Sequence, residues 1–310
     1  MAVFILKRAA QAVPVLLGVT ILVFAILQLI PGNPAQILLL GTGATPAQVA
    51  QLDRQLGLDQ PVVLQYFHYL GRLLTGNLGY SYVTQQTVTS EIASRLPFTL
   101  SLTGAALLVA LLVGIPLGII AGLRSGGLVD TLATGVSVLG VAVPYFWLAI
   151  LLILVFAVKL GILPVLGTGS PAALVLPAVS LGWGYSGIIT RLLRNGLIEA
   201  YQRPFILVTR AKGLSGWQLL WKHGLRNAIA STVSVVGLQI GYLLAGSVAI
   251  ETIFGRPGLG SFLVQSIQEK DIPSVQGIVL VVALVYVGVN LVVDVLHALI
   301  DPRIRRAVSV

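Results

Sequence analysis

Long apolar runs separated by shorter polar stretches dominate the pattern along this chain. A helical span of a bilayer takes about 20 mainly apolar residues, and six runs reach that length. Segments such as 107–113 (LLVALLV) lack the alternation of a transmembrane β-strand. Because lipid offers the backbone no hydrogen-bond partners, each run is expected to be an α-helix. The expected spans are 10–30, 98–122, 131–158, 172–193, 228–250 and 277–300.

The composition supports this reading. Of the 310 residues, 56% are hydrophobic and 9% are charged, whereas soluble domains carry roughly 25% charged residues. The chain has no cysteine, which excludes disulfides and thiolate metal sites. The expected fold class is therefore an all-α polytopic membrane protein with about six transmembrane helices.

In a membrane protein, the basic residues behind the net charge of +9 indicate first how the chain is oriented in the membrane, and not which ligand it binds. With a cytoplasmic N-terminus, six of the nineteen Lys and Arg residues fall in external segments, and the other thirteen fall in cytoplasmic ones. This bias predicts that both termini are cytoplasmic. The six external residues are Arg54, Arg72, Arg95, Lys159, Arg256 and Lys270.

Three regions follow from these spans. Lys7 and Arg8 precede the first run, and no cleavage site of small residues follows it at once, so residues 1–30 are expected to form an uncleaved signal-anchor helix. Residues 31–97 form an extracytoplasmic loop, and residues 98–310 form a five-helix core.

The external loop is amphipathic. Thr45 to Gln48 reads as a capping box with Pro46 at the first helical position, and Gly57 ends that helix. A second helix is expected from Pro61 to Gly76. Its apolar face either packs on the bundle or lies at the membrane interface. The loop is equally compatible with a structural cap and with a docking surface.

Small residues recur at four-residue spacing within two spans. They let helix backbones approach closely, and packing within the chain is a better explanation than a dimer seam. Pro116 and Pro144 are expected to release backbone hydrogen bonds locally. The small residues are Gly114, Gly118 and Gly122 in the second span, and Ala230, Ser234, Gly237, Gly241, Ala245 and Ala249 in the fifth.

Ionisable residues within the spans are few. Asn290, Asp294 and His297 share one side of the last span near its cytoplasmic end. They suit either a proton relay or, as we prefer, a polar cluster that holds the tail at 301–305. No other span carries a carboxylate near its middle, which argues against an ion-coupled carrier.

Enzyme motifs are missing. The chain has no phosphate-binding loop, no serine-protease elbow and no metalloprotease motif. The stretch 182–187 (GWGYSG) matches a dinucleotide fingerprint, but it lies inside a span with no preceding strand. The three histidines, His68, His223 and His297, are too scattered for a metal site. We therefore expect no catalytic, cofactor-binding or metal-ligating residue.

One cytoplasmic loop, 196–227, is long and basic. Pro204 divides it, residues 205–212 look helical, and Gly213 breaks the chain. Ser215 can cap a second helix that runs from 216 to about 226. Trp217, Leu220 and Trp221 are expected to form one apolar ridge. The ridge suits an anchor at the membrane surface as well as a docking element for a cytosolic partner.

Several motifs resemble those of one family in the same order from end to end. TRAKGLS at 209–215, followed by HGLRNA at 223–228, looks like the cytoplasmic loop of ABC importer permeases of the dipeptide/oligopeptide/nickel class. The long external loop resembles that of the first permease of the pair. Further matches are LIPGNP at 29–34, LGLDQP at 56–61, GNLG at 76–79, ETIF at 251–254 with PGLG at 257–260, and LIDPR at 299–303.

The resemblance implies a type I ABC importer permease-like bundle whose segment 211–222 is a coupling helix in a groove of an ATPase subunit. Leu207 stands where the broader importer pattern has an acidic residue, and Arg226 stands where many importers have proline. Members of the peptide class share both departures, so they narrow the assignment to that subfamily. The residues implied in coupling are Arg210, Ala211, Lys212, Gly213, Leu214, Ser215, Trp217, Leu220, Trp221, His223 and Arg226.

The resemblance also implies the partner proteins and the subcellular location. They are a second homologous permease subunit, two ATP-binding subunits that hold ATP and Mg, and an extracytoplasmic substrate-binding protein, with no nucleic acid. The location is the bacterial or archaeal cytoplasmic (inner) membrane. The segment with Glu251, Arg256, Pro257, Gly258 and Gly260 is a candidate outer gate or binding-protein contact, or a plain turn.

The substrate expected from the family is a peptide, although nickel, glutathione and oligosaccharide permeases share the pattern. The chain itself is expected to perform no chemistry. The alternative from another class is a self-contained secondary carrier or channel.

Overall fold

The structure is a computed structural model that describes residues 2–29, 35–36, 39, 45–213 and 215–300. Helices joined by turns make up this part of the chain, and a single bridge between Tyr80 and Thr87 is its only β-pairing. The helices are α1 (Ala2–Gln28), α3 (Pro46–Leu56), α4 (Val62–Leu74), α5 (Val88–Leu123), α6 (Leu128–Ala142), α7 (Tyr145–Leu152), η1 (Ile153–Lys159), α8 (Ala172–Gln202), α9 (Pro204–Ala211), α10 (Gly216–Leu219), η2 (Leu220–Gly224), α11 (Leu225–Ile253), α12 (Leu259–Gln268) and α13 (Ile272–Ile300).

The all-α membrane fold is confirmed. Five of the described helices are long and apolar enough to cross a membrane, namely α1, α5, α8, α11 and α13. The expected span at 131–158 is not one straight helix, because α6 and the α7–η1 helix meet at a 100° bend. Counted as one broken span, this pair is the sixth candidate crossing among the described helices.

Pro144 explains the bend. A proline lacks the N–H that would continue the helix, and it forces the residue before it out of the helical region. Val143 accordingly has φ −83° and ψ 120°, and α7 starts again at Tyr145. Pro116 stays inside α5 without such a break.

Close packing of α5 on α8 forms the centre of the bundle. A side-chain carbon added at Gly114 would lie 2.8 Å from the carbonyl oxygen of Ser186, and one at Gly118 would lie 3.0 Å from that of Thr190. At Gly122 the nearest atom would be the Cβ of Leu197, at 2.9 Å. The four-residue glycine spacing thus serves packing within the chain, as the sequence predicted.

A buried apolar cluster joins these two helices to α11. Leu102 of α5, Leu181 of α8 and Ile250 of α11 are fully buried there, together with Phe254. A second cluster, built around Phe262 of α12, lies between α5, α12 and α13. The outer end of α11 is therefore held in the apolar interior.

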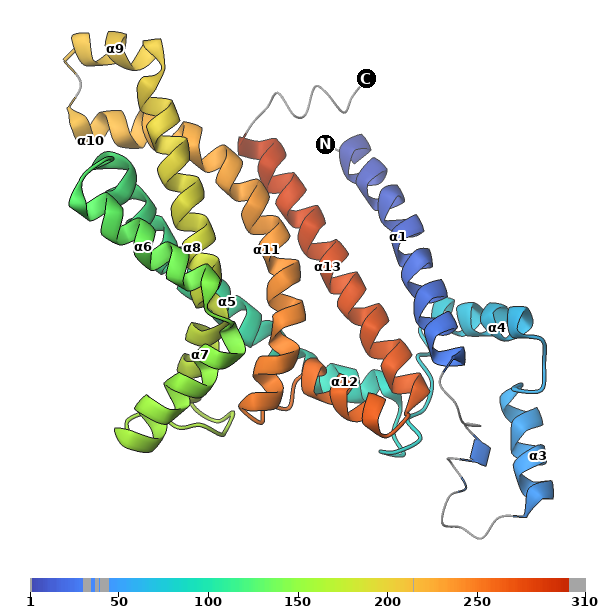
Figure 1. The fold of residues 1–310 in the computed structure, drawn as a ribbon. Coiled ribbons are helices and arrows are strands. Elements are labelled where there is room, and N and C mark those ends of the chain that lie inside the picture. The colour runs from blue at the N-terminus through green and yellow to red at the C-terminus, as the bar shows by residue number, and fades with distance from the viewer. Residues whose placement is uncertain (1, 30–34, 37–38, 40–44, 214, 301–310) are drawn as a thin grey trace.

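The two ends of the bundle differ in what they carry (Figure 1). The N-terminal end of α1, the C-terminal end of α13 and the α9–α10 segment gather at one end, and α3, α4 and α12 lie at the other. In the predicted topology the first is the cytoplasmic end. The expectation that the N-terminus and the long basic loop share one side agrees with this arrangement.

The polar residues of the last span can be described only in part, so their role in holding the tail stays a prediction. Asp294 pairs with Arg8 of α1, with 3.3 Å between the carboxylate oxygen and the guanidinium nitrogen. The Asn290 side chain donates to the carbonyl oxygen of Tyr286 within α13. The His297 side chain and the tail 301–310 lie outside the described residues.

The two external helices form where the sequence placed them. Thr45 caps α3 with both hydrogen bonds of a capping box to Gln48, and Gly57 closes the helix in the left-handed conformation at φ 69°. The second helix, α4, begins one residue after Pro61 and ends before Gly76. Both sets of signals act over a few residues, which explains why the sequence reveals them.

Candidate functional site

The segment predicted to couple this chain to an ATPase comprises α9, α10 and η2, and is called the coupling element after that prediction. It projects from the cytoplasmic end of the bundle (Figure 1). Gly213 adopts φ 79° between α9 and α10, a left-handed conformation that glycine reaches without steric cost. Ser215 then caps α10, since its hydroxyl accepts from the backbone N–H of Gln218 and the Gln218 side chain accepts from the N–H of Ser215. These local signals confirm the predicted helix–turn–helix.

The predicted apolar ridge of three residues is wrong in one member. Trp217 and Trp221 are 68% and 49% exposed, and their rings meet edge to face with centroids 5.4 Å apart. Leu220 instead faces inward and is 3% exposed, packed with Leu193 and Leu197 of α8. The coupling element therefore exposes a pair of tryptophans on its outer side, and the adjacent Leu220 packs it against α8.

The predicted end of the second helix near Arg226 is also wrong. From α10 the chain continues through the π-helical turn η2 directly into α11. A rigid displacement of α10 would consequently be passed along a continuous helical path to the outer end of α11. Single π-turns of this kind are frequent at functional sites.

Some of the predicted coupling residues can be placed. The Lys212, Gly213 and Ser215 positions are exposed to solvent. Leu214 lies outside the described residues, and so do the side chains of Arg210, Ala211, His223 and Arg226.

A cavity of about 910 Å³ lies beside the coupling element, and sequence reasoning did not find it. It is bounded by the cytoplasmic ends of α5 and α8 and by α10, with Leu123, Tyr201 and Trp217 among its lining residues. Its lining is mainly apolar, so it suits apolar side chains rather than an ion. It forms from three segments distant in sequence, which left no local signal.

At the opposite end, a buried carboxylate holds the segment between α11 and α12. Glu251 is fully buried, and its Oε2 accepts from the backbone N–H groups of Gly260 and Ser261 at 2.7 and 3.2 Å. These N–H groups belong to the first turn of α12, where no helical partner exists and a negative charge is favoured. Glu251 therefore caps α12 from the preceding helix.

Thr99 of α5 joins this outer junction. Its hydroxyl donates to Glu251 Oε1 at 2.7 Å and accepts from the N–H of Leu259 at 2.8 Å. Three helices, α5, α11 and α12, are thus tied at one point. The carboxylate would also crowd any side chain added at Gly258.

Arg256 lies in the same junction and is 5% exposed. Its Nη2 donates to the Ser101 hydroxyl at 3.5 Å, and its Nε has no hydrogen-bond partner. Burial lowers the pKa of the guanidinium from its ordinary value, while the nearby Glu251 raises it. Of the five residues predicted for an outer gate or a binding-protein contact, only Pro257 is exposed.

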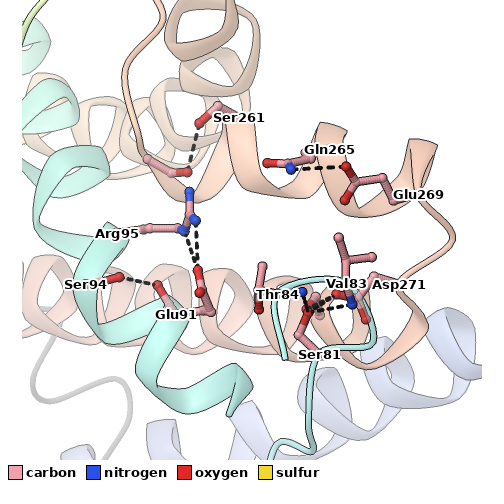
Figure 2. Close-up of polar contacts among 12 residues, drawn as sticks. Ser81, Val83, Thr84, Glu91, Ser94, Arg95, Ser261, Gln265, Glu269 and Asp271 are labelled. Carbon is pink, nitrogen blue, oxygen red and sulfur yellow. Dashed lines mark hydrogen bonds and ion pairs between the residues drawn. The ribbon is translucent and has the colours of Figure 1, made fainter. Parts of the chain in front are cut away.

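A second buried carboxylate holds the next turn, as Figure 2 shows. Asp271, at the start of α13, accepts from the hydroxyls of Ser81 and Ser274 and from the N–H of Tyr82. Ser81 in turn accepts from the N–H groups of Val83 and Thr84. The external turn at 80–87 is thereby fixed to the α12–α13 connection. Burial raises the pKa of the Tyr82 phenol above its ordinary value, Arg72 lowers it, and Asp271 adds to the increase.

The first turns of α5 contribute a third contact to this region (Figure 2). Glu91 pairs with Arg95 at 2.8 Å, and the Arg95 guanidinium lies 4.3 Å from the ring centroid of Phe262 in α12. The sequence did not reveal the roles of Thr99, Glu91 and Asp271. For the two carboxylates, the scarcity of charged residues in the chain was an available signal, because carboxylates close to apolar spans need partners.

At the cytoplasmic end, α6 is fixed to α8 by an ion pair. Both oxygens of Asp130 accept from Arg194, at 2.5 and 2.6 Å, and one of them also accepts from the N–H of Gly126. Asp130, in the first turn of α6, and Glu251, in the last turn of α11, therefore both hold their helices to neighbouring ones.

Comparison with known proteins agrees with this arrangement. Residues 114–306 match the model of the family described as "Binding-protein-dependent transport system inner membrane component", and residues 1–103 match its N-terminal counterpart. A putative peptide transport system permease of Brucella abortus is 41% identical, covering 98% of this chain and 99% of that protein. A di/tripeptide transport system permease of Pseudomonas aeruginosa is 38% identical, covering 97% and 98%. A glutathione transport system permease of Salmonella typhimurium is 40% identical over the same shares.

Solved structures share the fold at lower identity. A chain of the MetNI methionine ABC transporter, captured in an inward-facing conformation, aligns with a TM-score of 0.55 and 21% identity over 68% of this chain and 96% of that one. A chain of an amino acid ABC transporter aligns with a TM-score of 0.52 and 19% identity, covering 69% and 94%. With the two family models matched along almost the whole length, this chain belongs to the inner membrane components of binding-protein-dependent transport systems.

Proposed function

We propose that this chain is the first permease of a pair in an ATP-driven importer of small peptides. A second homologous permease would complete the translocation pathway. Two ATP-binding subunits would hold ATP and Mg and hydrolyse the nucleotide, and an extracytoplasmic binding protein would deliver the substrate. This chain contributes the pathway and the coupling element, without chemistry of its own.

The coupling element is the observation that carries the proposal. It presents the exposed rings of Trp217 and Trp221 on one side, while the adjacent Leu219 and Leu220 are 2% and 3% exposed. A tryptophan pair on a projecting turn suits the central contact of a protein interface, where tryptophan is enriched. Because the element continues into α11, a partner that moves it also moves a helix which reaches the outer junction.

The mechanism follows from this continuity. Closure of the ATPases on ATP displaces the coupling element, and α11 transmits the displacement towards the Glu251 junction that joins it to α5 and α12. A binding protein can shift the permease towards the outward-open state only through a higher affinity for that state. The exposed Pro257, beside the buried junction, is the candidate contact for it.

Peptides are the proposed substrate class because the relatives with similar sequences are named for peptide transport. The names of the three relatives above refer to peptide, di/tripeptide and glutathione transport, and glutathione is itself a tripeptide. Each relative aligns over at least 97% of this chain.

The test is ATP-dependent uptake of a labelled dipeptide into liposomes that contain this chain, its companion permease and both ATPases, with the binding protein outside. We expect uptake that requires ATP and every subunit. Liposomes with this chain alone are the control, and flux there would replace the proposal with a self-contained carrier or channel. Uptake of Ni²⁺ or an oligosaccharide in place of peptide would retain the permease role and reject the substrate class.

A further inference from the structure

The external helix α4 presents an apolar side to its surroundings. Val63, Phe67 and Leu74 are 67%, 61% and 84% exposed. Their spacings of four and seven residues place them along one side of the helix, which we call the α4 apolar stripe. Such a side normally faces a core rather than the surroundings.

The opposite side of α4 is polar and faces the rest of the protein. Gln65, His68 and Arg72 line a cavity of about 500 Å³ that is also bounded by α1, by the turn at 77–82 and by the start of α13. Two tyrosines hold the helix in place here. Tyr66 is within hydrogen-bond distance of Thr20, at 3.0 Å, and Tyr69 stacks on Phe24 with ring centroids 6.0 Å apart.

This arrangement is the reverse of a helix on a water-facing surface, where polar residues point outward. The helix is attached through its polar and aromatic side and leaves its apolar side uncovered. An occupant of low polarity is therefore needed over the α4 apolar stripe.

The neighbouring span indicates which occupant fits. In Figure 1, α4 runs across the outer end of α1 instead of along it. The α1 span itself leaves Ile21, Leu22 and Ile26 more than half exposed, as a helix covered by lipid does. Because Tyr69 of α4 stacks on Phe24, four residues before the end of α1, the helix lies at the level where the span ends.

The chemistry of the stripe favours lipid over a water-soluble partner. Specific protein interfaces make about one hydrogen bond per 100–200 Å², whereas Val63, Phe67 and Leu74 offer no side-chain donor or acceptor. Acyl chains require none. A cationic group on the opposite side, here Arg72, is also typical of helices that lie at a lipid surface.

We propose that α4 lies in the outer membrane surface with its apolar stripe among the lipid acyl chains. The external segment that follows α1 is then held at the level of the membrane, and the cavity on the polar side of α4 faces away from the lipid. This role is independent of which substrate the permease carries.

The absence of cysteine from the chain allows a direct test. Single variants Phe67→Cys and Leu74→Cys, spin-labelled in the full chain and reconstituted in phosphatidylethanolamine/phosphatidylglycerol liposomes, report collisions with oxygen and with a water-soluble nickel chelate. We expect a several-fold higher oxygen-to-nickel ratio at both positions than at Gln55→Cys, an exposed site on α3. His68→Cys, on the cavity side of α4, should resemble Gln55→Cys.

Two results would overturn the proposal. Nickel collisions at positions 67 and 74 as frequent as at position 55 would place the stripe in water. Loss of collisions with both reagents, either in the liposomes or only after a binding protein is added, would mean that protein covers the stripe in place of lipid. Agreement between two separate label positions guards against a local distortion caused by either substitution.

Discussion

The two ends of α11 differ in whether their side chains are buried or exposed. At the outer end, Glu251 is fully buried, and its carboxylate accepts from the Thr99 hydroxyl and from the N–H groups of Gly260 and Ser261. At the cytoplasmic end, the helix passes through a π-turn into an element whose two tryptophans are exposed. A junction whose central carboxylate is satisfied by neighbouring groups can be stable in a single chain. An exposed tryptophan pair needs a partner, so the contrast separates the part that holds the structure from the part that is offered to other subunits.

The largest effect should come from breaking the outer junction. Glu251→Ala leaves the N–H groups of Gly260 and Ser261 and the Thr99 hydroxyl buried without an acceptor, which should cost about 3 kcal/mol or more of stability. Thermal unfolding of the purified protein in detergent measures the loss. The exposed neighbour Thr252→Ala is the control, and equal unfolding temperatures for the two variants would contradict the capping role.

At the cytoplasmic end, adjacent residues should separate stability from association. Leu220→Ala removes a buried side chain packed on α8 and should cost about 3 kcal/mol. Trp221→Ala, at a half-exposed position, should cost less than about 1 kcal/mol and yet weaken co-purification of the ATPase subunits. Unfolding temperature and co-purification are measured on the same preparations. Normal association of Trp221→Ala together with Trp217→Ala would refute the assignment of the tryptophan pair as a contact.

A smaller loss is expected at the α12–α13 connection. Asp271→Ala removes the acceptor for Ser81, Ser274 and the N–H of Tyr82, which should cost about 2 kcal/mol and release the turn at 80–87. Limited proteolysis of the reconstituted protein should then cut that turn faster. Glu269→Ala, which loses only an exposed contact with Gln265, should leave the cleavage rate unchanged.

The smallest effect compares two glycines in the coupling element. Gly213→Ala forces a side chain into a left-handed conformation and should cost about 1 kcal/mol. Gly216→Ala is the matched control, because neither position has a neighbouring atom within 4 Å of an added Cβ and Gly216 has no positive φ. ATPase activity stimulated by the binding protein should fall for the first variant only. An equal fall for both would show that the conformation of Gly213 does not matter.

The sequence predicted best those features whose causes are local. The capping box at Thr45, the helix cap at Ser215 and the break at Gly213 involve neighbours within three residues, and each appears in the structure. The glycines of α5 were also interpreted correctly, because their spacing is a property of one helix. Pro144 was noticed, but its 100° bend was not, since the proline alone does not determine where the following helix packs.

The residues that were missed or misplaced depend on distant partners. Leu220 was predicted on the outer ridge because its spacing from Trp217 fits, yet α8 lies on that side and buries it. The pairing of Asp294 with Arg8, which is 286 positions earlier in the chain, was not predicted. Thr99 gave no signal, because a lone threonine in a span acquires its role only when α11 and α12 arrive beside it.

The sequence by itself therefore determined the class of protein, the positions of five long helices and the family, because long apolar runs, caps and motifs are properties of consecutive residues. The tertiary structure alone decided which carboxylates are ties, which side of the coupling element faces outward and which side of α4 is left apolar. These features depend on which side chains are buried, and burial is decided by how segments distant in the sequence pack together. The cost of an unpaired polar group in an apolar interior then selects Glu251, Asp130 and Asp271 as the charges that hold helices together.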